Sequence, residues 1–134
     1  MNFSKTTEYA LRILSYISLD EYKLYSATEL SEKLDIPYRY LRKLMNILSK
    51  QGLLNSIQGK QGGYKIAKNL SDITLFEIVN ATEDYSKENQ CFFGFQECPL
   101  QNRCSMHNKW GEVRDQTFSI LKNTSLLDIK NDNS

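Results

Sequence analysis

The chain of 134 residues contains a single histidine and lacks the motifs that mark most enzymes. It has no Walker phosphate loop, no nucleophile elbow and no Cys-x-x-Cys redox pair, so no catalytic set can be assembled from it. It also has no apolar run of about eighteen residues, the length that a membrane-spanning helix needs, and no apolar signal core near Met1. We therefore expect a cytoplasmic protein that is not an enzyme.

Acidic residues are missing from a long central stretch, because no Asp or Glu lies between Asp35 and Asp72. Residues 1–70 hold 11 basic and 6 acidic side chains, whereas residues 71–134 hold 6 and 10, so the two parts carry net charges of +5 and −4. A positive field without interspersed acids is typical of surfaces that meet phosphate, and it predicts contact with nucleic acid. The basic residues of the acid-free stretch are Arg39, Arg42, Lys43, Lys50, Lys60, Lys65 and Lys68.

Cysteine is scarce but concentrated. Cys91, Cys98 and Cys104 lie within fourteen residues, and the only histidine, His107, follows three positions later. An odd number of thiols in a reducing compartment does not indicate a disulfide framework, and a polar loop is a poor place for buried thiols. Thiolates with a histidine are ligands for iron-sulfur clusters and also for tetrahedral zinc. The spacing therefore predicts a metal site, with both metals open as alternatives.

The first half of the chain predicts three helices in succession. Apolar residues at helical spacing indicate an amphipathic helix over residues 4–19. Ser26 and Glu29 have the spacing of a capping box and begin a short second helix that ends near residue 34. Pro37 suits the first position of a third, basic helix, which Gly52 ends. A short helix, a tight turn and a longer basic helix together predict a helix-turn-helix.

A hairpin is predicted directly after these helices. Residues 53–57 and 64–67 resemble two short strands, and the loop between them contains Gly59, Gly62 and Gly63. A glycine-rich loop that cradles phosphate would open a helix, whereas this one joins two strands. The predicted fold class is thus mostly α with a small β-hairpin wing, that is, a winged helix-turn-helix.

The second half predicts a fourth helix around residues 75–79, an irregular loop over residues 84–104, and a long helix after it. Because apolar residues recur on one face of the long helix, that face needs a partner, which we expect to be a second copy of the chain. Folding back on the helix's own domain is the alternative. The stripe consists of Met106, Trp110, Val113, Thr117, Ile120 and Leu121, and the tail from Asn131 is predicted to be disordered.

DNA reading is predicted to divide between the third helix and the wing. In a helix-turn-helix the second helix of the motif enters the major groove, while the preceding helix approaches the backbone. Arg42 is the best candidate for reading a base, because a guanidinium can pair with both acceptors of guanine. In the wing, Lys60 is the cation of the loop that joins the two predicted strands. The other predicted contacts are Tyr38, Arg39 and Lys43 on the third helix, and Ser26 and Thr28 at the start of the second.

Several motifs together resemble the IscR- and NsrR-type winged-helix regulators of the Rrf family. The resemblance spans residues 2–127 and implies a dimeric transcription factor whose cluster state changes its affinity for a pseudo-palindromic promoter site. It adds Tyr40 and Gln58 to the predicted DNA contacts. Relatives often have an acid where this chain has Arg42 and an arginine where it has Gln58, so a different target sequence is expected. The matching motifs are residues 7–12, Tyr40-Leu41, residues 51–54 with Ser56, Gly62-Gly63-Tyr64 and the three cysteines.

The same resemblance implies an iron-sulfur cluster, either [2Fe-2S] or [4Fe-4S], held by the three cysteines and one further ligand. His107 would complete the set as in the [2Fe-2S] proteins of the IscR type. Glu8 occupies the position of an acid that NsrR-like proteins donate from the opposite subunit to a [4Fe-4S] cluster. The alternatives for Glu8 and His107 are a surface ion pair with Arg12 and a hydrogen bond to a nearby carbonyl.

Three regions with different roles are expected: a DNA-binding domain over residues 1–82, a cysteine-containing loop over residues 83–104, and a dimerisation helix with its tail over residues 105–134. The predicted function is a transcriptional repressor that senses redox state, nitric oxide or iron status through its cluster. The alternative is a winged-helix regulator with structural zinc or a cysteine thiol switch and no cluster.

Overall fold

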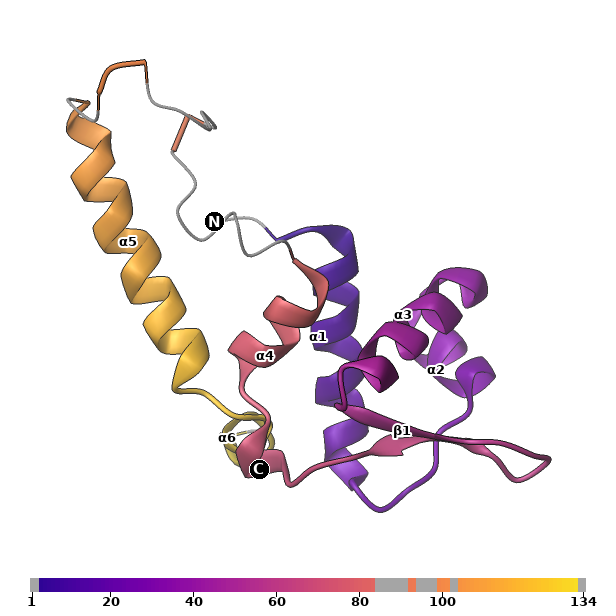
Figure 1. Ribbon diagram of the computed structural model, residues 1–134. Helices are drawn as coiled ribbons and strands as arrows, with labels where there is room; N and C mark the ends of the chain where they lie inside the picture. Colours follow the sequence, from indigo (N-terminus) through magenta and orange to yellow (C-terminus); the bar gives the residue numbers. More distant parts are fainter. Residues whose placement is uncertain (1–2, 84–91, 94–98, 102–103, 133–134) are drawn as a thin grey trace.

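The computed structural model describes residues 3–83, 92–93, 99–101 and 104–132, which form a mostly helical molecule with one hairpin and a long helix that stands apart from the rest (Figure 1). Two short 3-10 turns, Ser18–Asp20 and Leu70–Asp72, join neighbouring elements. The elements are α1 (Lys5–Ile17), α2 (Ala27–Leu34), α3 (Tyr38–Lys50), β1 (Leu54–Ile57), β2 (Gly63–Ile66), α4 (Leu75–Thr82), α5 (Ser105–Lys122) and α6 (Leu126–Asp132). The predicted fold class, mostly α with a small β-hairpin wing, is confirmed.

The capping residues of α2 and α3 act in different ways. The Ser26 hydroxyl accepts a hydrogen bond from the amide of Glu29 at 3.0 Å, which confirms Ser26 as the cap of α2. At the start of α3 the prediction was one residue off: Pro37 is the capping residue, with an extended ψ of 132°, and Tyr38 is the first helical residue. Pro37 still serves the helix, because its carbonyl accepts the first hydrogen bond, from Leu41, at 2.9 Å.

The wing is an antiparallel hairpin in which Leu54 pairs with Ile66 and Ile57 pairs with Gly63. Its other edge carries a pairing that the sequence did not predict. Tyr25 and Tyr64 exchange backbone hydrogen bonds of 2.9 and 2.7 Å, so the segment before α2 joins the hairpin. The backbones of Gly63 and Tyr25 approach so closely at this edge that a side chain on Gly63 would clash. A Cβ on Gly63 would lie 2.6 Å from the Tyr25 carbonyl oxygen.

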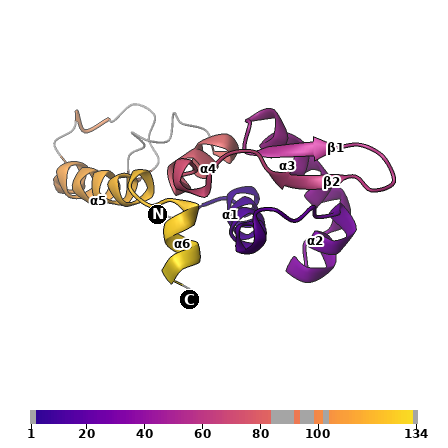
Figure 2. The same cartoon turned by 90° about the horizontal axis from the view of Figure 1, so that it is seen from below.

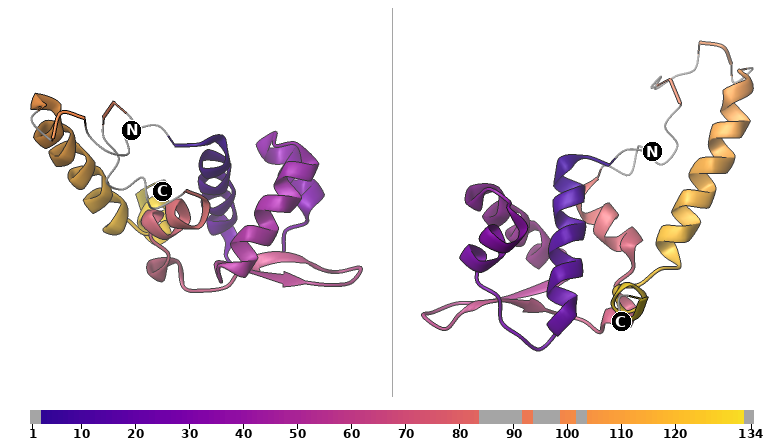
Figure 3. Two further views of the ribbon diagram at one scale, coloured as in Figure 1. Left: turned by 45° about the horizontal axis from the view of Figure 1, so that its top comes forward. Right: turned by 180° about the vertical axis from the view of Figure 1, so that it is seen from behind.

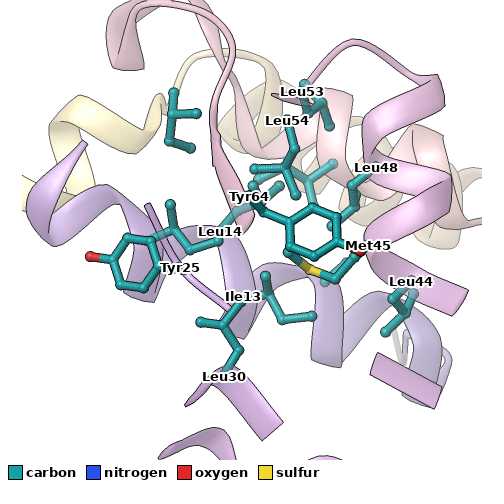
Figure 4. Close-up of a cluster of buried hydrophobic side chains, with 14 of the residues drawn as sticks. Ile13, Leu14, Tyr25, Leu30, Leu44, Met45, Leu48, Leu53, Leu54 and Tyr64 are labelled. Atoms are coloured by element: carbon teal, nitrogen blue, oxygen red, sulfur yellow. The ribbon is translucent and has the colours of Figure 1, made fainter. Parts of the chain in front are cut away.

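A single core joins α1, α2, α3 and the wing (Figure 4). α1 lies at its centre, and its inward face is fully buried. In the views of Figures 1 and 3, α2, α3 and the wing lie on one side of α1, and α4 and α5 lie on the other. The central residues of this core include Ile13, Leu14, Leu30, Leu41, Leu44, Met45, Leu48 and Leu54.

α5 contacts the rest of the protein mainly through its C-terminal half. Phe118 and Leu121 pack with Val79 of α4 in a second, smaller core, and the Phe118 ring meets Phe76 edge to face at 6.0 Å between centroids. The other face of α5 is open, with Val113 51% and Ile120 59% exposed. The helix thus stands away from the wing, at the opposite end of the molecule (Figure 2).

α6 was not predicted, and it corrects the expectation of a disordered tail for Asn131 and Asp132, which belong to this helix. Ser125 and Asp128 form a reciprocal capping pair at its start, with hydrogen bonds of 2.9 and 3.2 Å. Leu126 is fully buried in the main core, and the Leu126 amide donates to the Ile73 carbonyl at 2.9 Å. The chain therefore returns from α5 to the main core that contains α1, α2 and α3.

Candidate nucleic-acid interface and cysteine site

The exposed face of α3 carries the cations that the sequence predicted. Leu41, Leu44, Met45 and Leu48 fill the buried face of this helix, so Arg39, Arg42 and Lys43 are left exposed to solvent. No acidic residue lies in the first turn of α3. The surface can therefore attract a phosphate backbone without first breaking internal ion pairs on this helix.

Arg42 is the most constrained of these cations. Its Nη1 atom donates a hydrogen bond to the Tyr38 hydroxyl at 3.2 Å, and its guanidinium carbon lies 6.0 Å from the centre of the Tyr38 ring. The pKa of Arg42 is raised, first by this hydrogen bond and then by the proximity of Tyr64 and Tyr38. Both Tyr38 and Arg42 are exposed, so the pair is available to a ligand.

Tyr40 has contacts inside the protein. Its hydroxyl is hydrogen bonded to Thr6, and its ring meets Tyr9 edge to face at 5.4 Å between centroids. These contacts join α3 to α1, and Tyr40 packs partly buried against the main core. A contact between Tyr40 and DNA remains a prediction.

The other predicted DNA residues lie on exposed parts of α2 and the wing. Ser26 and Thr28 are exposed at the start of α2, and Gln58 and Lys60 are exposed in the wing loop, where Gln58 donates to the Ser56 hydroxyl at 3.4 Å. Lys68, counted above in the basic stretch, forms an ion pair with Glu77 of α4 at 3.0 Å. It is thus less available to phosphate than the cations of α3.

Cys104 caps the long helix. Its sulfur accepts a hydrogen bond from the amide of Met106 at 3.4 Å, and its carbonyl accepts one from the amide of His107 at 3.1 Å. Cys104 is a free, half-buried thiol, and His107 is exposed in the first turn of α5. This places two predicted ligands at the start of the same helix.

The remaining predicted ligands are not all described. Cys91 and Cys98 lie outside the described residues, and within the described part of the chain no three His, Cys, Asp or Glu side chains gather as a metal would require. Phe92, which follows Cys91 in the sequence, packs against Trp110 of α5 at 5.5 Å between ring centroids. The segment after Cys91 is therefore held to the same helix that Cys104 caps.

Glu8 is half-buried in the first turn of α1. Its carboxylate pairs with Lys5 at 3.6 Å, while the Arg12 guanidinium lies 5.7 Å from the centre of the Tyr9 ring. The surface ion pair considered for Glu8 thus forms with Lys5, and Arg12 stacks on an aromatic ring.

Sequence reasoning missed a polar cluster beside this region. The Glu83 carboxylate accepts hydrogen bonds from the Ser4 amide at 2.7 Å and from the Thr7 hydroxyl at 2.8 Å, and Thr7 also contacts the Thr82 hydroxyl at 2.7 Å. Glu83 precedes the cysteine loop in the chain, so the cluster joins the start of that loop to the start of α1. The only sequence signal was Ser4 as a capping residue.

The comparisons with known proteins agree with this geometry. An NsrR regulator from Oceanobacillus iheyensis is 31% identical over 98% of this chain and 92% of its own length. The structure is similar to that of CymR, the global cysteine regulator of B. subtilis, with a TM-score of 0.80, 23% identity and coverage of 98% and 97%. It is also similar to T. potens IscR, with a TM-score of 0.79, 22% identity and coverage of 100% and 89%.

No helix among the described residues is long and apolar enough to cross a membrane. The family described as Rrf2, iron-dependent transcriptional regulator, matches residues 3–132, which is nearly the whole chain. That match confirms both the resemblance seen in the sequence and the prediction that the chain is not an enzyme. The chain belongs to the Rrf2 family of transcriptional regulators, and this family implies DNA binding.

Proposed function

We propose that the chain is a cytoplasmic, homodimeric repressor whose affinity for promoter DNA is switched by an iron-sulfur cluster on Cys91, Cys98 and Cys104. The observation that carries the proposal is the position of Cys104. It caps α5 with an amide hydrogen bond to its sulfur, and hydrogen bonds to sulfur are among the features that tune such clusters. The contact between Phe92 and Trp110 supports it, because it holds the chain next to Cys91 against the same helix.

The fourth ligand is either His107 or Glu8. His107 lies in the same helical turn as the Cys104 cap, so it suits a site built within one subunit. Glu8 lies on α1 and forms an ion pair with Lys5. If Glu8 of the opposite subunit is the fourth ligand, the cluster would join α1 of one subunit to the cysteine loop of the other. Both donors are chemically suited to complete a three-thiolate set.

Dimerisation is proposed to use the open face of α5. Val113 and Ile120 are seven residues apart, which places them two turns apart on one side of the helix, and both are more than half exposed. Phe118 and Leu121, which lie on a different face, are already covered by α4. A second copy of α5 would bury this apolar face. The two-fold axis that relates the two subunits would then match a pseudo-palindromic DNA site.

DNA recognition is proposed to follow from α3 and the wing. α3 would lie in the major groove, where Arg42 reads a guanine and Arg39 and Lys43 contact phosphates. Ser26 and Thr28 would approach the backbone at the start of α2. The exposed wing loop would bring Gln58 and Lys60 to the neighbouring groove.

Switching would act through the chain segments that meet at the cysteine site. The bound cluster supplies iron-sulfur bonds that oxidation, iron scarcity or nitric oxide can break. Ligation would hold residues 91–107 at the start of α5 and, if Glu8 is the fourth ligand, would tie them to α1 of the partner subunit. Release of these residues would change the separation of the two α3 helices, on which binding to a two-part site depends.

Metal analysis tests the cofactor directly. Iron, acid-labile sulfide and zinc would be measured on protein purified without oxygen, together with the visible absorption spectrum. We expect iron and sulfide in near-equal amounts, both lost in Cys104→Ala. Glu8→Ala beside His107→Ala then assigns the fourth ligand, because only the true ligand's removal destabilises the cluster. Zinc alone would indicate a structural metal site, and no metal would indicate a thiol switch.

A further inference from the structure

Tyr38 and Arg42 form a preformed pair on the exposed face of α3. They lie one helical turn apart, and the Tyr38 hydroxyl accepts a hydrogen bond of 3.2 Å from Nη1 of Arg42. The guanidinium carbon also lies within cation-π range of the ring, at 6.0 Å from its centroid. Tyr38 is 46% exposed, so its ring and hydroxyl can be reached by a ligand.

The wing packs against the helix that carries Arg42. Tyr64 of β2 is only 8% exposed, and its ring lies beside Met45 of α3 in the core (Figure 4). The pKa of Arg42 is raised, first by the hydrogen bond that Arg42 donates to the Tyr38 hydroxyl and then by Tyr64.

This arrangement leaves the guanidinium able to read a base. An arginine has five N–H donors, of which the bond to Tyr38 uses one, and bidentate pairing with guanine O6 and N7 needs two. An arginine on an exposed helix face otherwise samples many rotamers, all but one of which would be lost on binding. A side chain that is already held loses less freedom when it pairs with guanine.

We propose that Tyr38 is a positioning residue: it holds the Arg42 guanidinium for guanine and thereby sets the base preference of this regulator at one position of each half-site. The inference rests on the proposed DNA-reading role of α3. It differs from a phosphate contact by Tyr38, because a phosphate contact would strengthen binding to all sequences alike.

The test separates base discrimination from overall affinity. The preferred duplex of the wild-type protein is first selected from a random duplex pool. Affinities are then measured for a panel of duplexes that each carry one base-pair substitution. Arg42→Ala is expected to lower discrimination at one G·C pair of each half-site by roughly 5- to 150-fold. Tyr38→Phe keeps the ring and removes the hydroxyl, and it is expected to lower discrimination at the same pair by roughly three- to tenfold.

Two controls complete the design. Tyr22→Phe removes a hydroxyl from a tyrosine that is 82% exposed on the turn before α2, and it should leave the whole panel unchanged. In the Arg42→Ala background, Tyr38→Phe should have no further effect on discrimination. A uniform loss of affinity, an effect at another base pair or no effect in Tyr38→Phe would overturn the positioning role. A wild-type protein that selects no sequence would overturn the DNA-reading role of α3 itself, and the inference with it.

Discussion

Thr7 is polar and yet fully buried, and its hydroxyl connects three segments of the chain. It donates to the Glu83 carboxylate at 2.8 Å, lies 2.7 Å from the Thr82 hydroxyl, and accepts from the Ser4 hydroxyl at 3.2 Å. The Glu83 carboxylate also accepts a hydrogen bond from the Ser4 amide, so its negative charge lies at the positive end of α1. This cluster ties α4 to the first turn of α1 directly before the cysteine loop begins.

Replacing Thr7 by valine keeps the shape of the side chain but removes the hydroxyl. We expect the free energy of unfolding to fall by roughly 1–3 kcal/mol, because the half-buried Glu83 carboxylate and the Thr82 hydroxyl each lose a partner. Urea unfolding followed by circular dichroism measures this change. Thr28→Val, at an exposed position of α2, is the matched control and should change stability far less. Equal stabilities of the two variants would show that the cluster is not a structural tie.

Arg42 and Lys60 are expected to differ in how they affect binding. Arg42→Ala should relax specificity at one base pair, whereas Lys60→Ala should weaken all sequences alike and reduce the slope of log affinity against log salt by about one. Fluorescence anisotropy with matched and substituted duplexes, at several salt concentrations, measures both effects. If the two variants weakened every duplex equally, the division between base reading and phosphate contact would be wrong.

At the scale of elements, the wing depends on the close approach of Gly63 to Tyr25. A Cβ on Gly63 would lie 2.6 Å from the Tyr25 carbonyl oxygen, and Tyr25 and Tyr64 are joined by two backbone hydrogen bonds. We expect Gly63→Ala to cost roughly 1–3 kcal/mol, as these bonds must lengthen or break. Thermal unfolding would measure this loss of stability as a lower Tm. Gly111→Ala in α5, where the nearest neighbour is an Arg114 nitrogen at 3.5 Å, should instead be neutral or stabilising. A harmless Gly63→Ala would contradict the packing at this edge.

The elements that the sequence predicts well are those with local signals. Ser26 caps α2 as its spacing suggests, and the apolar positions of α1 and α3 are buried as their periodicity requires. The pairing of Tyr25 with Tyr64 has no such signal, because a single residue pairs across a long sequence separation and shows no alternation. Long-range contacts of this kind are decided by the assembled core.

α6 shows a local signal that was present but overlooked. Ser125 and Asp128 have capping-box spacing, and Leu126 supplies the buried anchor, yet the polar residues from Asn131 suggested a disordered tail. In the candidate site, the positive surface of α3 was predictable, because the sequence has no acidic residue between Asp35 and Asp72. The influence of Tyr64 on the pKa of Arg42 was not predictable, because it depends on the wing packing against α3. The contact between Phe92 and Trp110 likewise depends on tertiary packing.

At the scale of the whole molecule, the proposed DNA-reading surface of α3 and the helix that Cys104 caps lie on opposite sides of α1. α3 and the wing occupy one side, and α5, whose first turn carries Cys104 and His107, stands on the other (Figure 1). α1 contacts α3, α4 and α6, and α3 also contacts α4 directly, so a change on one side can reach the other through α1 and through α4. Communication between the two sites is therefore expected to pass through α1, through α4 and through the partner subunit.

The open face of α5 predicts the assembly. Val113→Lys combined with Ile120→Lys should convert a dimer to a monomer, because two charges would enter an apolar contact, and DNA affinity should fall with it. Sedimentation velocity gives the mass in solution. Ser119→Lys, an exposed position on another side of α5, is the matched control and should remain dimeric. A double variant that stays dimeric would place the interface elsewhere.

The most direct measurement compares the promoter affinity of the cluster-loaded protein with that of the same preparation after the cluster has been removed without oxygen. Affinities that differ by tenfold or more, with Cys104→Ala fixed at the cluster-free value, are the result we predict. Equal affinities of the two forms for the same duplex would contradict a cluster-switched regulator, while leaving the chain a DNA-binding member of its family.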